Sequence, residues 1–113
     1  MAFDGKEGRP ITLDQAKRWT KRYRDENKGA VKAQFFGCEN IQKLLDEPGC
    51  MGIRVYYGID DDGNPKLMLV GAKRDQNNIL PNSEGKDGED GEILDDGALC
   101  PDKCPDGDDP LTN

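Results

Sequence analysis

The chain has 113 residues, of which 34% are apolar and 35% charged, a length typical of one small domain. Such a domain buries only about 60 to 65% of the surface that its unfolded chain exposes, so a large substrate cavity is not expected. No apolar run approaches the roughly 18 residues of a membrane span, and the charged N-terminus has no signal-peptide hydrophobic stretch. We therefore predict a cytoplasmic protein with no membrane partner.

Charge is divided unevenly along the chain. Residues 82–113 carry 11 acidic and two basic side chains, a net charge of −9, whereas residues 1–81 carry 12 acidic and 14 basic ones, a net charge of +2. Nucleic acid is not an expected partner, because phosphate binding needs positive charge. We expect a flexible lead-in at 1–10, a folded domain at 11–81, and an irregular acidic tail rich in glycine and aspartate at 82–113.

The first predicted element is a helix over residues 13–27. Thr12 is a good N-cap, and Gln15 three residues later completes a capping box. Gly29 suits the left-handed position that ends a helix. The helical spacing of the apolar side chains gives this helix one apolar face, made of Leu13, Ala16, Trp19, Thr20 and Tyr23.

The rest of the domain reads as strands around a second, shorter helix. A strand is expected at 30–36 and a helix at 39–46. Residues 51–59 alternate between apolar and other side chains, and 66–72 returns as the partner strand of a β-hairpin. The segment between them, 60–65, has the aspartate, glycine and asparagine of a turn. The sequence thus predicts a small α+β fold of order α-β-α-β-β, with an antiparallel hairpin and helices on one sheet face.

Both faces of the predicted sheet carry apolar side chains. Residues 67–70 are apolar at successive positions, and successive side chains of a strand point to opposite faces. Helices cover one face, so the other must be covered by the tail, a second copy or a partner protein. The tail offers Ile79, Leu80, Ile93, Leu94 and Leu99 for this purpose, and our candidates for a partner-binding face are Arg54, Tyr56, Met68 and Val70.

Nothing in the sequence indicates an active site. The chain has no histidine, which removes the commonest general base and every nucleophile that depends on one. The acidic clusters lie in predicted turns or in the tail, where exposure leaves a carboxyl pKa near its ordinary value. We therefore predict no catalytic residue, no cofactor and no small-molecule substrate.

The four cysteines leave three readings open. Cys100 and Cys104 have a C-x3-C spacing that fits half of a zinc site, whose other half would be Cys38 and Cys50. A disulfide between Cys100 and Cys104, or from either of them to Cys38 or Cys50, is the second reading and needs an oxidising compartment. Four free thiols are the third.

Several short motifs together carry a resemblance. Phe35-Phe36-Gly37, the strand 52–60, Leu69-Val70-Gly71 and the closing Cys-Pro-x2-Cys element resemble a group of small bacterial proteins with no established activity. The resemblance covers most of residues 11–104 and implies a bacterial origin.

The functional prediction is a non-enzymatic interaction or assembly module, present as an oligomer or as a subunit of a larger complex. The alternative is a small zinc-binding or thiol-redox module that uses Cys100 and Cys104.

Overall fold

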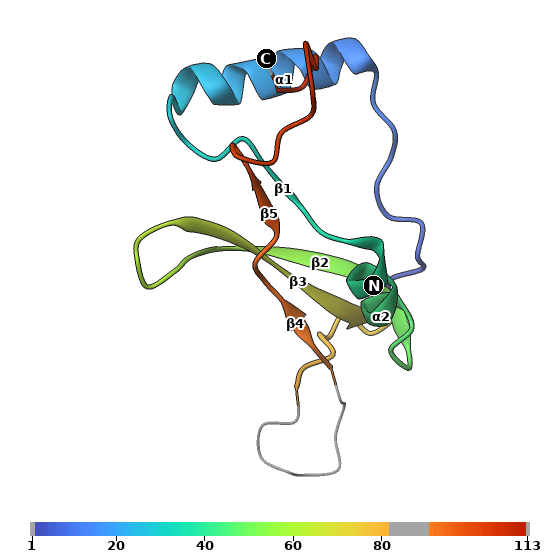
Figure 1. The fold of residues 1–113 in the computed structure, drawn as a ribbon. Helices are drawn as coiled ribbons and strands as arrows, with labels where there is room; N and C mark the ends of the chain where they lie inside the picture. The colour runs from blue at the N-terminus through green and yellow to red at the C-terminus, as the bar shows by residue number, and fades with distance from the viewer. Residues whose placement is uncertain (1, 82–90, 113) are drawn as a thin grey trace. The chain divides into compact units, whose positions relative to one another are not determined.

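The computed structural model describes residues 2–81 and 91–112, and it has the α+β composition that the sequence predicts (Figure 1). Each of its two compact units is built from separate stretches of the chain. The first unit comprises Met1–Glu7 and Phe36–Gly97, and the second comprises Gly8–Phe35 and Ala98–Asn113.

The first unit is built on a long antiparallel hairpin. β2 (Cys50–Ile59) pairs with β3 (Pro65–Lys73), as predicted, and β3 pairs on its other side with the short β4 (Ile93–Leu94). Between β2 and β3, the Asp60 carboxylate accepts hydrogen bonds from the backbone N–H groups of Asp62 and Asn64, at 3.0 and 2.8 Å. The bond from Asn64 is the main reason that the pKa of Asp60 lies below its ordinary value.

The helix of this unit, α2 (Cys38–Leu45), packs on one face of the hairpin near the start of β2 and the end of β3 (Figure 1). Leu44 is its one buried residue. Gly71 faces the helix, since a Cβ built there would lie 3.4 Å from the Leu44 carbonyl oxygen and 2.9 Å from Glu47 Oε1. The helix therefore approaches the sheet where the strand has no side chain. The buried apolar side chains of the unit are Leu44, Leu69, Val70, Ala72 and Ile79.

The chain after β3 extends the sheet sideways. Asn78 bridges to Ala72, and the Ile79 N–H donates to the Gly71 carbonyl at 2.8 Å. Leu94 and Ile93 then pair with Leu69 and Val70 along the same edge. The described part of the predicted tail is thus mostly turns and loops, with two short strands, and β4 lies beside β3 in the sheet instead of over a sheet face. Residues 82–90 of that tail lie outside the described residues.

The second unit contains α1 (Leu13–Glu26), close to the predicted helix. Gln15 N–H donates to Thr12 Oγ1 at 3.1 Å, and Thr12 N–H donates to Gln15 Oε1 at 3.4 Å, which confirms the predicted capping box. The Asn27 N–H donates to the Tyr23 carbonyl at the other end, before Gly29 with its φ of 83°. None of the residues of α1 is buried.

The remainder of the second unit pairs two segments that are far apart in the sequence. β1 (Ala33–Phe35), shorter than the predicted strand, pairs antiparallel with β5 (Ala98–Cys100). A disulfide joins Cys100 to Cys104, and Arg24 Nη1 donates to the Leu111 carbonyl at 2.6 Å. Two ion pairs lie within α1, Lys21–Asp25 and Arg22–Glu26, each between residues four positions apart.

Neither helix combines the length and the apolarity that crossing a membrane requires, as far as the described residues extend.

The close approach at Gly71 gives a test of how α2 is held. Gly71→Ala would place a methyl group against Glu47, the Cys50 thiol and the Leu44 backbone, and we expect a loss of about 1 to 3 kcal/mol in unfolding free energy. Urea denaturation measures this loss. Gly52→Ala is the matched control, because nothing lies within 4 Å of a Cβ there. Equal stabilities of the two variants would contradict the packing of α2 described here.

Candidate functional site

The register of the hairpin sorts its side chains into two faces. Arg54 lies opposite Val70, and Tyr56 lies opposite Met68, so the four predicted partner-binding residues share one face. We call it the Tyr56 face. Val70 on this face is buried and Met68 half-buried, whereas 43% of the Tyr56 surface is exposed. The structure therefore brings the four residues together but leaves mainly Tyr56 accessible to another protein.

A chain of polar contacts crosses the Tyr56 face. Arg54 Nη1 donates to the Gln76 carbonyl at 3.0 Å and to Asn78 Oδ1 at 2.6 Å. Asn78 Nδ2 in turn donates to the Tyr56 hydroxyl at 2.7 Å. This bond, together with the nearby Arg54 guanidinium, lowers the pKa of Tyr56 because both stabilise the phenolate. The loop after β3 is thereby tied to β2 across the intervening strand.

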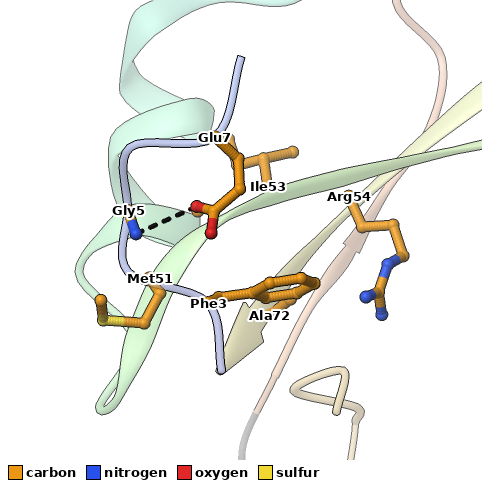
Figure 2. A pocket seen from close by; sticks show the side chains of 8 residues that line it. Phe3, Gly5, Glu7, Met51, Ile53, Arg54 and Ala72 are labelled. Carbon is orange, nitrogen blue, oxygen red and sulfur yellow. Dashed lines mark hydrogen bonds between the residues drawn. The ribbon is translucent and has the colours of Figure 1, made fainter. Parts of the chain in front are cut away.

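The N-terminal segment lies at the other side of Arg54 and forms a pocket of about 270 Å³ (Figure 2). The Phe3 N–H donates to the Arg74 carbonyl at 2.8 Å, and the Arg54 guanidinium carbon lies 5.3 Å from the centroid of the Phe3 ring, a cation–π contact. Residues 2–7, expected as a lead-in, are thus attached to the hairpin. The pocket is lined by Phe3, Gly5, Glu7, Met51, Gly52, Ile53, Arg54 and Ala72.

The charged side chains of this pocket form hydrogen bonds with backbone groups. The Glu7 carboxylate accepts hydrogen bonds from the N–H groups of Asp4 and Gly5, both at 3.0 Å, and closes the N-terminal segment into a turn; Figure 2 shows the bond from Gly5. These bonds hold the pKa of Glu7 below its ordinary value, so it is ionised at neutral pH. Such a carboxylate is not set up to donate a proton. The pocket fits a role in anchoring residues 2–7 better than a role in acid–base chemistry.

The opposite face carries the exposed apolar surface. Its accessible residues are Val55, Tyr57 and Ile59, with 44, 87 and 76% of their surfaces exposed, and we call it the Tyr57 face. Gly71 and α2 belong to this face, so the helix covers its other end. An eight-residue helix is about 12 Å long, whereas a ten-residue strand spans about 33 Å. The half of the hairpin near the turn therefore extends beyond the helix.

The partner-binding candidates chosen from the sequence lie on the Tyr56 face, whereas the most exposed apolar residues of β2 have the other parity. Residues 53, 55, 57 and 59 are all apolar, a pattern that normally marks the buried face. The available signal was the shortness of the second predicted helix, which cannot cover the whole of such a row.

β2 also has an unpaired edge. In the sheet order β2-β3-β4 it is terminal, and among residues 2–81 and 91–112 no strand pairs with its outer side. Edge strands in natural proteins are commonly protected by prolines, lysines or short length. β2 is ten residues long and has one charged side chain, Arg54. Its outer edge is thus suited to pairing with another strand.

A half-buried carboxyl follows the end of α2. Glu47 Oε2 accepts a hydrogen bond from the Glu92 N–H at 2.9 Å, while Oε1 is buried and has no hydrogen-bond partner among the described residues. Desolvation raises the pKa of Glu47, although the Glu92 N–H partly offsets this. The group links the end of α2 to the residue that precedes β4.

The structure joins the two C-terminal cysteines to each other. Cys100 and Cys104 form a disulfide, whereas Cys38 is an exposed thiol and Cys50 a half-buried one that donates to the Gly52 carbonyl. Two sulfurs bonded to each other are not the thiolates that zinc requires. Among the described residues, no group of three or more potential ligands from Cys, Asp or Glu is arranged to hold a metal ion.

Comparison with known proteins adds no assignment to this geometry. No protein-family model matches the sequence, and no solved structure gives a significant match to the chain. The resemblance to small bacterial proteins stays a prediction, and function has to be argued from the faces and edge of the hairpin.

The contact between Asn78 and Tyr56 can be tested by titration. Asn78→Ala removes the main group that stabilises the Tyr56 phenolate, so the pKa of Tyr56 should rise toward the ordinary value of about 10. NMR of ring-labelled tyrosine measures it directly. Asn77→Ala, one residue away, is the control and should leave Tyr56 unchanged. A shift of the same size in both variants would mean that the loop acts on Tyr56 only through its overall position.

Proposed function

We propose that the protein is a non-enzymatic assembly module that binds another protein chain through the exposed half of its hairpin. The observation that carries this proposal is the coincidence of two features on one strand. The apolar row Val55, Tyr57 and Ile59 is exposed, and no strand of the described part of the chain pairs with the outer backbone edge of the same strand, β2. In this proposal the protein is present as an oligomer or as a subunit of a larger complex.

Physical chemistry supports this reading of both features. Neighbouring exposed apolar side chains mark interaction surfaces, because water disfavours such a patch unless a partner covers it. An unpaired edge offers backbone hydrogen bonds to a strand that adds to the sheet. Tyr57 is especially suited to an interface, since tyrosine gives a large contact area at low entropic cost.

The polar groups of the described residues support the non-enzymatic part of the proposal. Arg54 and Asn78 bond to each other and to neighbouring groups of the sheet, and Glu7 bonds to the backbone of its own turn. A catalytic constellation needs such groups directed at a common point where a substrate atom could lie.

The alternative, a thiol-redox module, is favoured by one observation, the disulfide between Cys100 and Cys104. In such a function a partner dithiol would attack this disulfide, lose two electrons to it and become oxidised, leaving two thiols on this chain. The disulfide also joins β5 to the turn that follows it, a purely structural role that the same bond fulfils without exchange.

A cytoplasmic location belongs to the proposal as well, and it bears on the disulfide. Cytoplasmic thiols are normally kept reduced. A disulfide in that compartment would therefore be a transient or redox-responsive one, whereas an oxidising compartment would keep it formed throughout.

Replacing Tyr57 tests the assembly proposal. We expect Tyr57→Lys to reduce the mass of the protein in solution from that of an oligomer to that of a monomer, because the interface would then bury a charge. Light scattering after size exclusion measures this mass. The fold should persist, since 87% of the Tyr57 surface is exposed.

Leu80→Lys is the control for that experiment, because it adds the same charge to an exposed apolar residue outside the hairpin. It should keep the mass of the parent protein. A monomeric parent protein at high concentration would refute the oligomer, and loss of assembly in both variants would remove the hairpin from the proposal.

Trapping thiols in intact cells tests the disulfide and the location together. Rapid alkylation under denaturing conditions, followed by mass spectrometry, should modify Cys38 and Cys50 only if the disulfide is formed, and all four cysteines if it is reduced. The cytoplasmic proposal predicts the fully modified form. Protein in which only two cysteines react would place the chain in an oxidising compartment.

A further inference from the structure

The backbone of β2 fixes which of its residues can bond to a neighbouring strand. In an antiparallel pair, hydrogen-bonded and non-hydrogen-bonded residue pairs alternate. Asp60 N–H donates to the Asn64 carbonyl at 2.9 Å, which makes these two a hydrogen-bonded pair at the end of the hairpin. Counting back along the register, Gly58, Tyr56 and Arg54 direct their backbone groups toward β3.

Two independent observations confirm this alternation. The Gly71 carbonyl, opposite Ile53, accepts a hydrogen bond from the Ile79 N–H at 2.8 Å on the side of β3 away from β2. Pro65, opposite Ile59, has no N–H, which costs nothing where no hydrogen bond to β2 is made. The odd-numbered residues of β2 therefore direct their N–H and C=O groups to the open edge, and these residues are Ile53, Val55, Tyr57 and Ile59.

The open stretch has definite ends. Near the start of β2, the N-terminal segment lies beside Met51, since a Cβ built on Gly5 would be 3.6 Å from the Met51 carbonyl oxygen. At the other end the strand stops at Ile59, before the turn. The free edge thus runs from Ile53 to Ile59, and its midpoint is Tyr56.

We infer that the occupant of this edge is a second copy of the chain, paired antiparallel along β2 about a two-fold axis beside Tyr56. The inference rests on the proposed function and names its partner and geometry. In this register Val55 faces Tyr57 of the partner subunit, and Ile53 faces Ile59 of the partner subunit. Every outward N–H and C=O group of the free edge then has a partner on the other copy. A register shifted by one residue would instead place these groups opposite residues whose backbone groups point toward β3.

Charge and the position of the N-terminal segment favour this axis over the two neighbouring ones. An axis beside Arg54 would set two Arg54 side chains directly opposite each other, an unfavourable like-charge pair. An axis beside Val55 would run Ile59 against Met51, where the N-terminal segment already lies. With the axis beside Tyr56, Arg54 faces Gly58 of the partner subunit, which has no side chain and no charge.

The same axis brings the exposed apolar groups together. On the Tyr57 face, the rows of the two copies become one continuous patch across the junction, with each Val55 against a tyrosine ring. On the other face, the two Tyr56 residues form a non-hydrogen-bonded pair at the axis, the closer type, with Cα atoms about 4.5 Å apart.

A cysteine at the axis tests the geometry. In a Cys38→Ser, Cys50→Ser background, Tyr56→Cys should form a disulfide-linked dimer on mild oxidation, because its Cα lies within disulfide range of its own symmetry mate. Arg54→Cys is the matched control on the same face. Two such cysteines would be about 14 Å apart in this register, beyond the roughly 7 Å limit, so no cross-link should form.

Amide hydrogen exchange of the unsubstituted chain at high and low concentration gives a second measurement. The N–H groups of Val55 and Tyr57 should lose protection on dilution, whereas that of Tyr56, bonded to β3, should keep it.

The outcomes separate this inference from the proposed function. An oligomer that cross-links through Tyr56→Cys and shows the alternating protection supports both. An oligomer that links through Arg54→Cys, or that shows neither the Tyr56→Cys link nor the alternation, overturns this geometry and leaves assembly standing. A protein that stays monomeric at every concentration overturns the second copy as occupant, and with it the oligomer.

Discussion

The difference in length between α2 and the hairpin is the constraint on which the rest of the first unit depends. The helix has eight residues and packs where Gly71 lets it approach the sheet, whereas β2 has ten and continues to the turn at Asp60. One end of the sheet consequently has a buried core around Leu44. At the other end, residues that would be buried under a longer helix are exposed to solvent, among them Tyr57. The buried and the exposed apolar side chains of the unit thus belong in large part to the same two strands.

Local signals predicted the elements well because each has a local physical cause. The capping box of Thr12 and Gln15 satisfies backbone groups within a few residues, so it could be recognised without knowledge of the fold. The turn after Ile59 combines aspartates with a glycine that tolerates positive φ, so a hairpin could be predicted at this point. The α+β class and the antiparallel pairing were accessible in this way.

The remaining features depend on contacts between distant residues, and the sequence did not reveal them. How much of each face of β2 is exposed depends on where α2 packs, and the apolar row at 53, 55, 57 and 59 by itself is typical of a fully covered face. The N-terminal segment looked like a lead-in because Phe3 is isolated among charged residues, yet its partners are Arg54 and Arg74. β4 and β5 have two and three residues, too few to produce a detectable pattern, and they exist because β3 and β1 provide their partners.

The division of the chain between its two units has a consequence for biosynthesis. Neither unit is continuous in sequence, and Gln34 of β1 pairs with Leu99 of β5, 65 residues later. While the ribosome is still making the chain, the hairpin and α2 are complete well before β1 has a strand to pair with. Pairing over such a separation is slow, because closing a long loop costs entropy before any contact offsets it. The small sheet of the second unit therefore cannot form until residues 98–100 have been made, and a chain released before that point lacks one of the two strands of this sheet.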